Sequence, residues 1–92
     1  MCKIRKGYRL RASIQVAFGQ TLRKYRLQQK LSQEKLAELA NLDRTYISQI
    51  ERGLKSPSIP TTIAIARALG VKAHLLIAEV EYELAKIPEQ EE

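Results

Sequence analysis

The chain has 92 residues, enough for one small domain, and its 45% hydrophobic and 28% charged content excludes an intrinsically disordered protein. Its single cysteine, Cys2, excludes an internal disulfide and a metal site built from cysteines. No run of 18 apolar residues and no secretory signal is present, which excludes a membrane span of that kind and favours the cytoplasm. A formal net charge of +6 favours a polyanionic partner, either nucleic acid or a membrane surface.

The charges are unevenly distributed along the chain. Residues 1–33 contain nine Lys or Arg and no acidic residue, whereas residues 79–92 contain six Glu and one Lys. This pattern indicates that one end of the protein faces phosphate while the other is held away from it.

Three segments are predicted. Residues 1–12 are strongly basic, and two interpretations of them are open: a solvated tail, or an arm that touches phosphates or enters a minor groove. Residues 13–87 are expected to form the folded domain. Residues 88–92 are acidic and expected to be disordered.

The first helix is predicted to begin after an N-cap at Ser13 and to end near Gln29. Apolar residues recur along it at spacings of four, four and three, which puts them on one helix face. These residues are Ile14, Phe18, Leu22 and Tyr25. Gly19 costs this helix about 1 kcal/mol relative to Ala, and a close contact with another helix is one reason to find it there.

The second and third helices are short and separated by a tight turn. Ser32 is a plausible N-cap for the second helix, and its inward side is predicted to be Leu36, Leu39 and Ala40. Asn41 follows, and Asn readily adopts the left-handed conformation that a turn requires. Asp43 is predicted to cap the third helix. Its inward residues are Ile47 and Ile50, and Gly53 ends it.

The fourth and fifth helices complete a predicted all-α, five-helix domain. Ser58 caps the fourth helix and Gly70 stops it, with Ile63, Ala66 and Leu69 as the buried stripe. The fifth is predicted over residues 73–87 and has two apolar strips. One contains Leu76, Val80, Leu84 and Ile87, and the other contains Leu75, Ala78, Tyr82 and Ala85. Because a surface helix of a monomer needs only one such strip, the second indicates contact with a second subunit.

The spacing of residues after Gln33 fits a helix-turn-helix at all seven diagnostic places. The fifth place needs a small residue and holds Ala37, and the ninth needs a residue that tolerates positive φ and holds Asn41. The fourth, eighth, tenth, fifteenth and eighteenth need apolar residues and hold Leu36, Ala40, Leu42, Ile47 and Ile50. The alternative is a helical hairpin with no role in DNA binding.

The segment SQEKLAELANLDRTYISQIERG, followed by PSIPTTIAIARALGV, resembles the Cro/C1-type helix-turn-helix of phage repressors and many bacterial regulators. The resemblance covers residues 14–71 and implies a lambda-repressor-like DNA-binding domain. The run NLDRTYISQIERG is similar to the controller proteins of restriction–modification systems, which are small dimeric regulators. Two features depart from the pattern: Asn41 replaces the usual turn Gly, and residues 1–12 are longer than controllers usually have.

The resemblance implies that the third helix lies in the major groove and contacts base edges through Arg44, Thr45, Ser48 and Gln49. The chemistry of these side chains agrees. Arg44 can bind guanine O6 and N7, Gln49 can pair with adenine, and the Thr45 methyl can meet a thymine methyl. A phosphate contact is the alternative for Arg44.

Phosphate contacts are implied for Gln33, Tyr46, Arg52, Lys55, Ser56 and Arg23. Gln33 begins the second helix, where a backbone N–H and a side-chain amide can both meet a phosphate. Partial packing is the alternative for Tyr46, and a solvated face explains Arg23 and Lys24 equally well. The family also implies a structural ion pair between Arg26 and Glu51.

The sequence offers no support for catalysis, a cofactor or a metal site, because the only histidine, His74, has no second ligand nearby. The predicted function is control of transcription by a homodimer on palindromic double-stranded DNA, blocking RNA polymerase or contacting it. The predicted dimer interface is Leu75, Leu76, Val80, Tyr82 and Leu84. An antitoxin-type module, a prophage repressor and a non-specific nucleic-acid-binding protein remain as alternatives.

Overall fold

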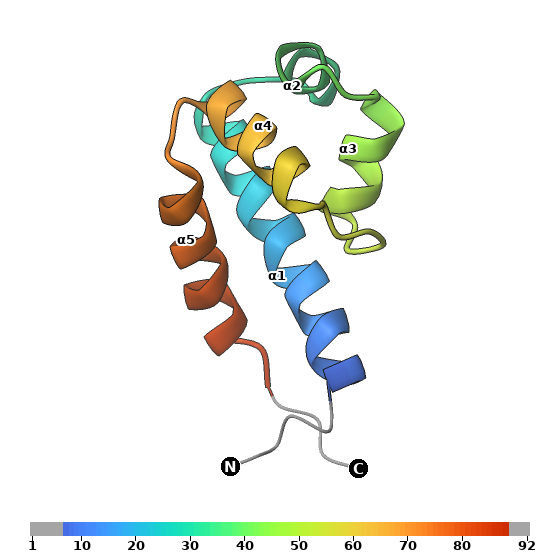
Figure 1. Ribbon diagram of the computed structural model, residues 1–92, viewed down its shortest axis with the longest axis vertical. Helices are drawn as coiled ribbons and strands as arrows, with labels where there is room; N and C mark the ends of the chain where they lie inside the picture. Colours follow the sequence, from blue (N-terminus) through green and yellow to red (C-terminus); the bar gives the residue numbers. More distant parts are fainter. Residues whose placement is uncertain (1–6, 89–92) are drawn as a thin grey trace.

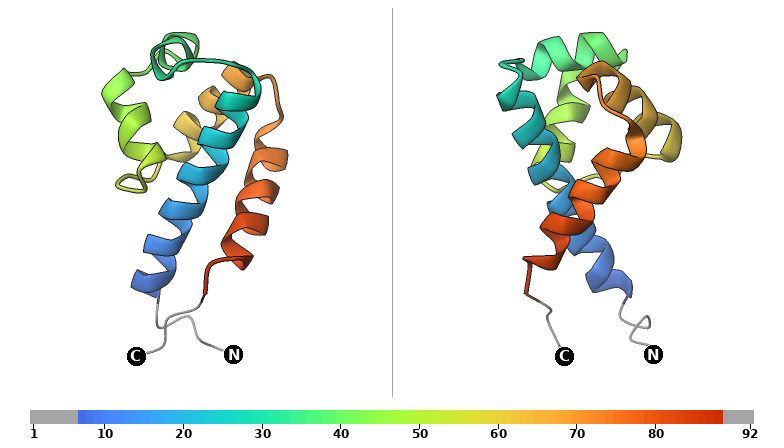
Figure 2. Two further views of the ribbon diagram at one scale, coloured as in Figure 1. Left: turned by 180° about the vertical axis from the view of Figure 1, so that it is seen from behind. Right: turned by 90° about the vertical axis from the view of Figure 1, so that its left-hand side faces the viewer.

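Five α-helices make up the part of the chain that the computed structural model describes, which is the backbone of residues 7–88 and the side chains of residues 10–88. They are α1 (Gly7–Gln28), α2 (Gln33–Ala40), α3 (Arg44–Glu51), α4 (Ile59–Leu69) and α5 (Ala73–Ala85). Helix α1 runs through the middle, with α3 and α5 on opposite sides of it, as Figures 1 and 2 show. The predicted all-α, five-helix fold is confirmed. None of these helices is both long and apolar enough to cross a membrane.

Helix α1 begins at Gly7, six residues before the predicted N-cap, so the prediction that Ser13 is its N-cap is wrong. Residues 8–12 contain no helix breaker, and a serine inside a helix costs little when no competing cap geometry forms. Residues 7–12 of the predicted arm are therefore helical. Residues 1–6 of that arm and residues 89–92 of the acidic tail lie outside the described part of the chain.

The predicted helix ends are largely confirmed. The Ser32 hydroxyl accepts a hydrogen bond from the Lys35 N–H at 2.9 Å, and the Ser58 hydroxyl accepts one from the Thr61 N–H at 3.3 Å. Gly70 ends α4 with a left-handed φ of 75°. Asp43 occupies the N-cap of α3, but its side chain makes no capping hydrogen bond.

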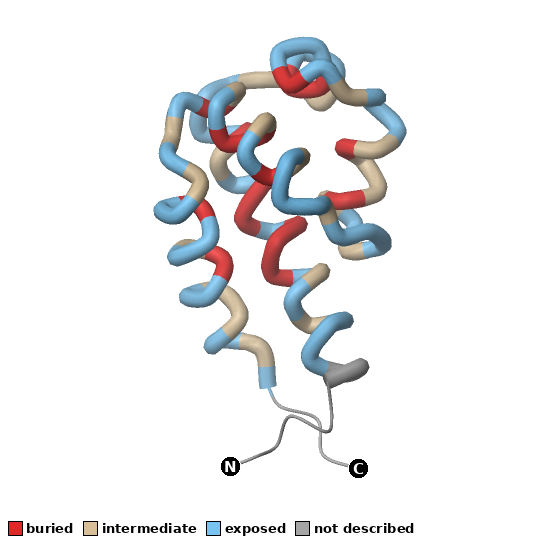
Figure 3. The backbone as a smooth tube through the Cα atoms, in the orientation of Figure 1, coloured by how far each residue is buried: buried red, intermediate tan, exposed pale blue. Residues whose placement is uncertain are grey.

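The core lies among the five helices, and Figure 3 shows its buried residues on the facing sides. Its buried hydrophobic residues are Ala17, Phe18, Leu22, Leu36, Ala37, Ala40, Ile47, Ile50, Ile65, Ala66, Leu69, Leu76 and Val80. Every helix contributes to this cluster. The short α2 and α3 are therefore held by tertiary packing, because helices of eight residues are not stable alone.

Three residues that were predicted to face inward are exposed: Ile14, Leu39 and Ile63. Each helix concerned has apolar residues on more than one side, and neighbouring helices decide which side is buried. In α4, for example, Thr62 and Ile65 are buried in place of Ile63.

Helix α5 ends at Ala85, and its first predicted strip faces the core of its own chain. Leu76 is fully buried and Val80 is 4% exposed, so their predicted roles in a dimer interface are wrong. Leu84 packs partly against the same core. Leu75 and Tyr82 are exposed.

Candidate nucleic-acid interface

The turn between α2 and α3 has the geometry that the spacing predicted. Asn41 adopts a left-handed φ of 58°, and the Leu42 N–H donates to the Ala37 carbonyl at 2.8 Å. Ala37 is buried, which lets the helices approach each other. The five apolar places also face inward, with Leu36, Ala40, Ile47 and Ile50 buried and Leu42 packed against the core.

The start of α3 presents the four predicted base-contacting side chains. Arg44 and Thr45 are exposed, and Ser48 and Gln49 are half-buried. Residues three and four apart lie on the same side of a helix, so these four form one polar face. Arg52 follows at the C-cap, and its Nε donates to the Ser48 carbonyl at 3.4 Å.

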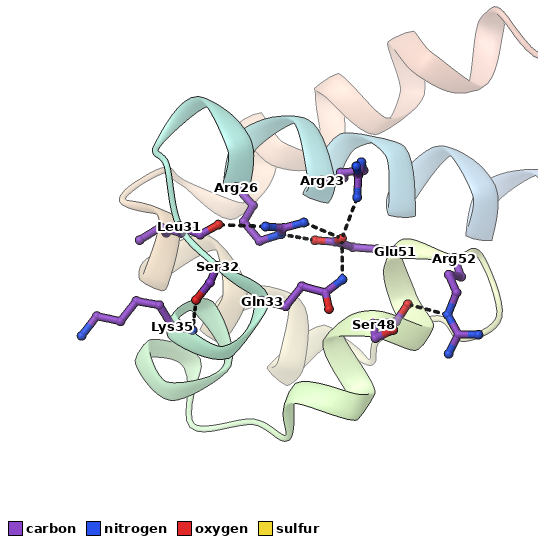
Figure 4. Close-up of polar contacts among 9 residues, drawn as sticks. All are labelled: Arg23, Arg26, Leu31, Ser32, Gln33, Lys35, Ser48, Glu51 and Arg52. Carbon is purple, nitrogen blue, oxygen red and sulfur yellow. Dashed lines mark hydrogen bonds and ion pairs between the residues drawn. The ribbon is translucent and has the colours of Figure 1, made fainter.

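The C-terminal end of α3 is bound to α1 by the predicted ion pair. Arg26 donates to the Glu51 carboxylate from Nε at 2.6 Å and from Nη2 at 3.0 Å, as Figure 4 shows. Its Nη1 donates to the Leu31 carbonyl at 2.8 Å. The two side chains are 8% and 3% exposed, so the predicted structural pair is confirmed and is largely buried.

Two more side chains converge on Glu51, which the sequence did not predict. The Gln33 amide donates to Glu51 at 3.0 Å, and the Arg23 Nη1 lies 3.8 Å from the carboxylate (Figure 4). Gln33 is 18 residues from Glu51, so no local pattern could have revealed the bond. Glu51 thus connects α1, the start of α2 and the end of α3. Phosphate contacts by Gln33 and Arg23 stay predictions.

Gly19 provides a second attachment of α3 to α1. A Cβ atom at this position would contact the Ile50 carbonyl oxygen and lie 2.7 Å from the Glu51 carbonyl oxygen. The predicted close helix contact is confirmed, because only a residue without a side chain allows this approach. The Gly19 contact and the Glu51 network fix the end of α3, so the polar face at its start has a defined orientation.

The remaining predicted phosphate-contacting residues lie around α3. Lys55 and Ser56 are exposed in the loop between α3 and α4. Tyr46 is partly buried and packs against the core, in agreement with the packing interpretation. A phosphate contact by its hydroxyl stays a prediction.

Lys24 is directed to α5 rather than to the surface around α3. Its ammonium group lies 2.8 Å from Glu79 and 3.5 Å from Glu83. The hydrogen bond to Glu79 raises the pKa of Lys24 above its ordinary value of 10.5. Lys24 therefore joins α1 to α5. This structural role accounts for a lysine at this position without a DNA contact.

A capped helix pair with an exposed polar face on its second helix, fixed against a third helix, defines a DNA-binding helix-turn-helix domain. A family model described as helix-turn-helix matches residues 22–76. The chain belongs to the Cro/C1-type helix-turn-helix family of transcriptional regulators.

Three relatives show the range of similar proteins. The control protein C.BamHI of Bacillus amyloliquefaciens is 48% identical over 61 residues, which span 65% of this chain and 75% of that protein. The immunity repressor of Bacillus phage phi105 is 43% identical over 61 residues, but these span 66% of this chain and only 42% of the repressor. The solved restriction–modification controller C.Esp1396I, a tetramer in complex with its natural 35 base-pair operator, matches with a TM-score of 0.73 and 33% identity. That match covers 79% of this chain and 96% of the controller chain.

Proposed function

We propose that this protein is a homodimeric transcriptional regulator that binds a palindromic operator, in the manner of restriction–modification controllers. The observation that carries the proposal is the polar face of Arg44, Thr45, Ser48 and Gln49 on a helix whose far end is fixed by Glu51. A fixed helix orientation is what base readout requires, because hydrogen bonds to base edges tolerate little displacement.

The side chains around α3 divide into two kinds of contact. Arg44 and Gln49 read bases, since a guanidinium matches guanine O6 and N7 and an amide matches adenine. The exposed Lys55 and Ser56 bind the backbone beside the groove. The half-buried Gln33 side chain donates one amide N–H to Glu51. Its second amide N–H and its carbonyl oxygen remain at the start of α2.

Dimerisation uses the exposed strip of α5, which contains Leu75, Ala78, Tyr82 and Ala85. Helix α5 lies on the opposite side of α1 from α3 (Figure 1). A two-fold dimer presents two copies of α3 about 34 Å apart, which matches successive major grooves on one side of the duplex. The operator complex of C.Esp1396I, a similar protein, supports this proposal.

Occupancy of such an operator controls transcription in the cytoplasm. A dimer bound across a promoter blocks RNA polymerase, and one bound beside it contacts the polymerase. The similar control protein C.BamHI and the similar restriction–modification controller C.Esp1396I support an assignment to the controllers of restriction–modification systems.

Selection of bound sequences from a random duplex pool tests the proposal. We expect enrichment of one inverted repeat with half-sites separated by about one helical turn, near 10 base pairs from centre to centre. Binding without enrichment of any sequence would contradict sequence-specific control and would favour the non-specific alternative. Enrichment of a single unrepeated half-site would contradict the dimer alone.

A further inference from the structure

Asp43 occupies the N-cap of α3, but its carboxylate does not cap the helix. In α2 and α4 the N-cap is a serine whose hydroxyl accepts a backbone N–H, from Lys35 and from Thr61 respectively. Helix α3 begins through the main chain of Asp43 instead, whose carbonyl accepts the N–H groups of Tyr46 at 3.0 Å and Ile47 at 3.1 Å. Because aspartate is among the best N-cap residues, a carboxylate that leaves this role is available to another partner.

The Asp43 carboxylate also has no cationic partner within residues 10–88. The acidic residues that form ion pairs in that part of the chain are Glu38, Glu51, Glu79 and Glu83. Asp43 and its neighbour Arg44 are both exposed. DNA phosphates repel an unpaired carboxylate, so such a group favours binding only where the DNA offers it a hydrogen-bond donor.

The start of α3 lies at the outer edge of the molecule, and the end of α3 lies against α1 (Figures 1 and 2). A recognition helix enters the major groove so that the residues at its start contact base edges. Asp43 is therefore at the end of α3 that approaches the bases, and the inference rests on the proposed function in this respect. The contacts of Glu51 and Gly19 at the opposite end hold the helix in this orientation.

The donors that the major groove offers are the amino groups of cytosine N4 and adenine N6. An ionised carboxylate accepts hydrogen bonds and cannot donate them. The adenine amino group lies beside the acceptor N7, which repels a carboxylate, whereas the edge of cytosine presents the N4 donor alone. A carboxylate therefore selects cytosine. An asparagine amide differs, because it can accept from adenine N6 and donate to N7 together.

The position of this cytosine follows from the base that Arg44 reads. Consecutive Cα atoms are about 3.8 Å apart, which is close to the spacing of about 3.4 Å between successive base pairs. If Arg44 binds guanine O6 and N7, the side chain before it reaches the neighbouring base pair. The opposite charges of Asp43 and Arg44 then match a donor beside two acceptors.

We propose that Asp43 reads cytosine N4 at the base pair next to the guanine bound by Arg44. The carboxylate contributes specificity more than affinity, because it weakens binding to every sequence that lacks this cytosine. Asp43 thus adds a fifth base-reading side chain to the polar face of α3, and it supplies the acceptor for an amino group that a cationic side chain cannot supply.

The test measures dissociation constants of wild type and Asp43→Asn on the selected operator and on its single-base changes. The wild type should prefer cytosine at one position of each half-site by about tenfold. Asp43→Asn should lose this preference against adenine, and Asp43→Ala should lose it against every other base. Both variants should keep the preference at the guanine position. Asp43→Ala should also melt near the wild-type temperature, because it removes no capping hydrogen bond.

Glu34→Gln is the matched control, because it removes an equal charge from the exposed first turn of α2. It should change the affinity for all sequences by the same factor. If Asp43→Asn behaved like Glu34→Gln, Asp43 would act only through its charge, and the inference would be overturned while sequence-specific binding stands. A fall in melting temperature for Asp43→Ala as large as that for Ser32→Ala would reveal a capping carboxylate and would also overturn it. A wild-type protein that bound every sequence equally would instead overturn the proposed function.

Discussion

Arg26 donates two hydrogen bonds to Glu51, and the two residues join the C-terminal part of α1 to the last turn of α3. The pair is largely buried, and Gln33 donates a third hydrogen bond to the same carboxylate. The residue that ends α3 is thus also the residue that orients the start of α2. The Glu51 carboxylate thus fixes the positions of α2 and α3 relative to each other.

Removal of this carboxylate should destabilise the whole domain. We expect Glu51→Ala to lower the free energy of unfolding by about 3–5 kcal/mol, because the buried Arg26 would keep its charge without a partner. Urea denaturation followed by circular dichroism measures the change. Arg26→Met/Glu51→Leu should cost less than the single substitution, since it buries no unpaired charge. Wild-type stability in Glu51→Ala would show that the pair is not structural.

The close approach of α1 and α3 should make Gly19 intolerant of a side chain. We expect Gly19→Ala to lower the free energy of unfolding by about 1–3 kcal/mol, because the new methyl group meets backbone carbonyl oxygens that cannot move aside. Gln20→Ala, at an exposed neighbouring position, is the matched control and should change stability little. A stabilised Gly19→Ala protein would indicate that helix propensity outweighs the contact.

The Lys24 ion pairs should contribute to stability in a pH-dependent way. Their hydrogen bond and charges raise the pKa of Lys24 in the folded state, so the folded protein holds this proton more tightly than the unfolded chain. The contribution is therefore present below pH 10.5 and is lost as the pH rises through the raised folded-state pKa. The melting-temperature difference between wild type and Lys24→Met should accordingly disappear in strong alkali. A difference that grows with pH would contradict this assignment.

The exposed strip of α5 should be required for dimerisation. We expect Leu75→Asp to shift the protein to a monomer in sedimentation experiments without unfolding it, because this side chain is 52% exposed in one chain. Leu76→Asp is a contrasting substitution and should unfold the domain, since Leu76 is fully buried. A Leu75→Asp protein that remains dimeric would place the interface elsewhere.

Features determined by neighbouring residues were predictable from the sequence. Ser32 and Asn41 act within one turn of their own positions, so their residue types were sufficient to predict the ends of α2. The face of a helix that is buried depends on its neighbours, and this is why Ile63 was predicted to be buried and Leu76 to be available to a partner. Where several sides of a helix are apolar, its periodicity alone does not select one.

The candidate site was likewise predictable from the sequence only in part. Arg44 and Gln49 could be identified because their place in the helix-turn-helix spacing fixes their side of α3. The hydrogen bond from Gln33 to Glu51 could not, since it joins two helices whose relative position depends on the whole core. Ser13 was misleading because a good N-cap residue is also tolerated inside a helix.

Sequence-dependent binding by α3 is the central claim, and a paired comparison of Arg44→Ala and Lys55→Ala tests it most directly. Affinities of both variants are measured against the selected operator and a set of its single-base changes, at several salt concentrations. Arg44→Ala should lose about 1–3 kcal/mol on the operator and relax the preference at one base position in each half-site. Lys55→Ala should weaken binding to all sequences alike and reduce the salt dependence. If Arg44→Ala also weakened every sequence equally, Arg44 would be a phosphate contact, and the account of base readout by α3 would be contradicted.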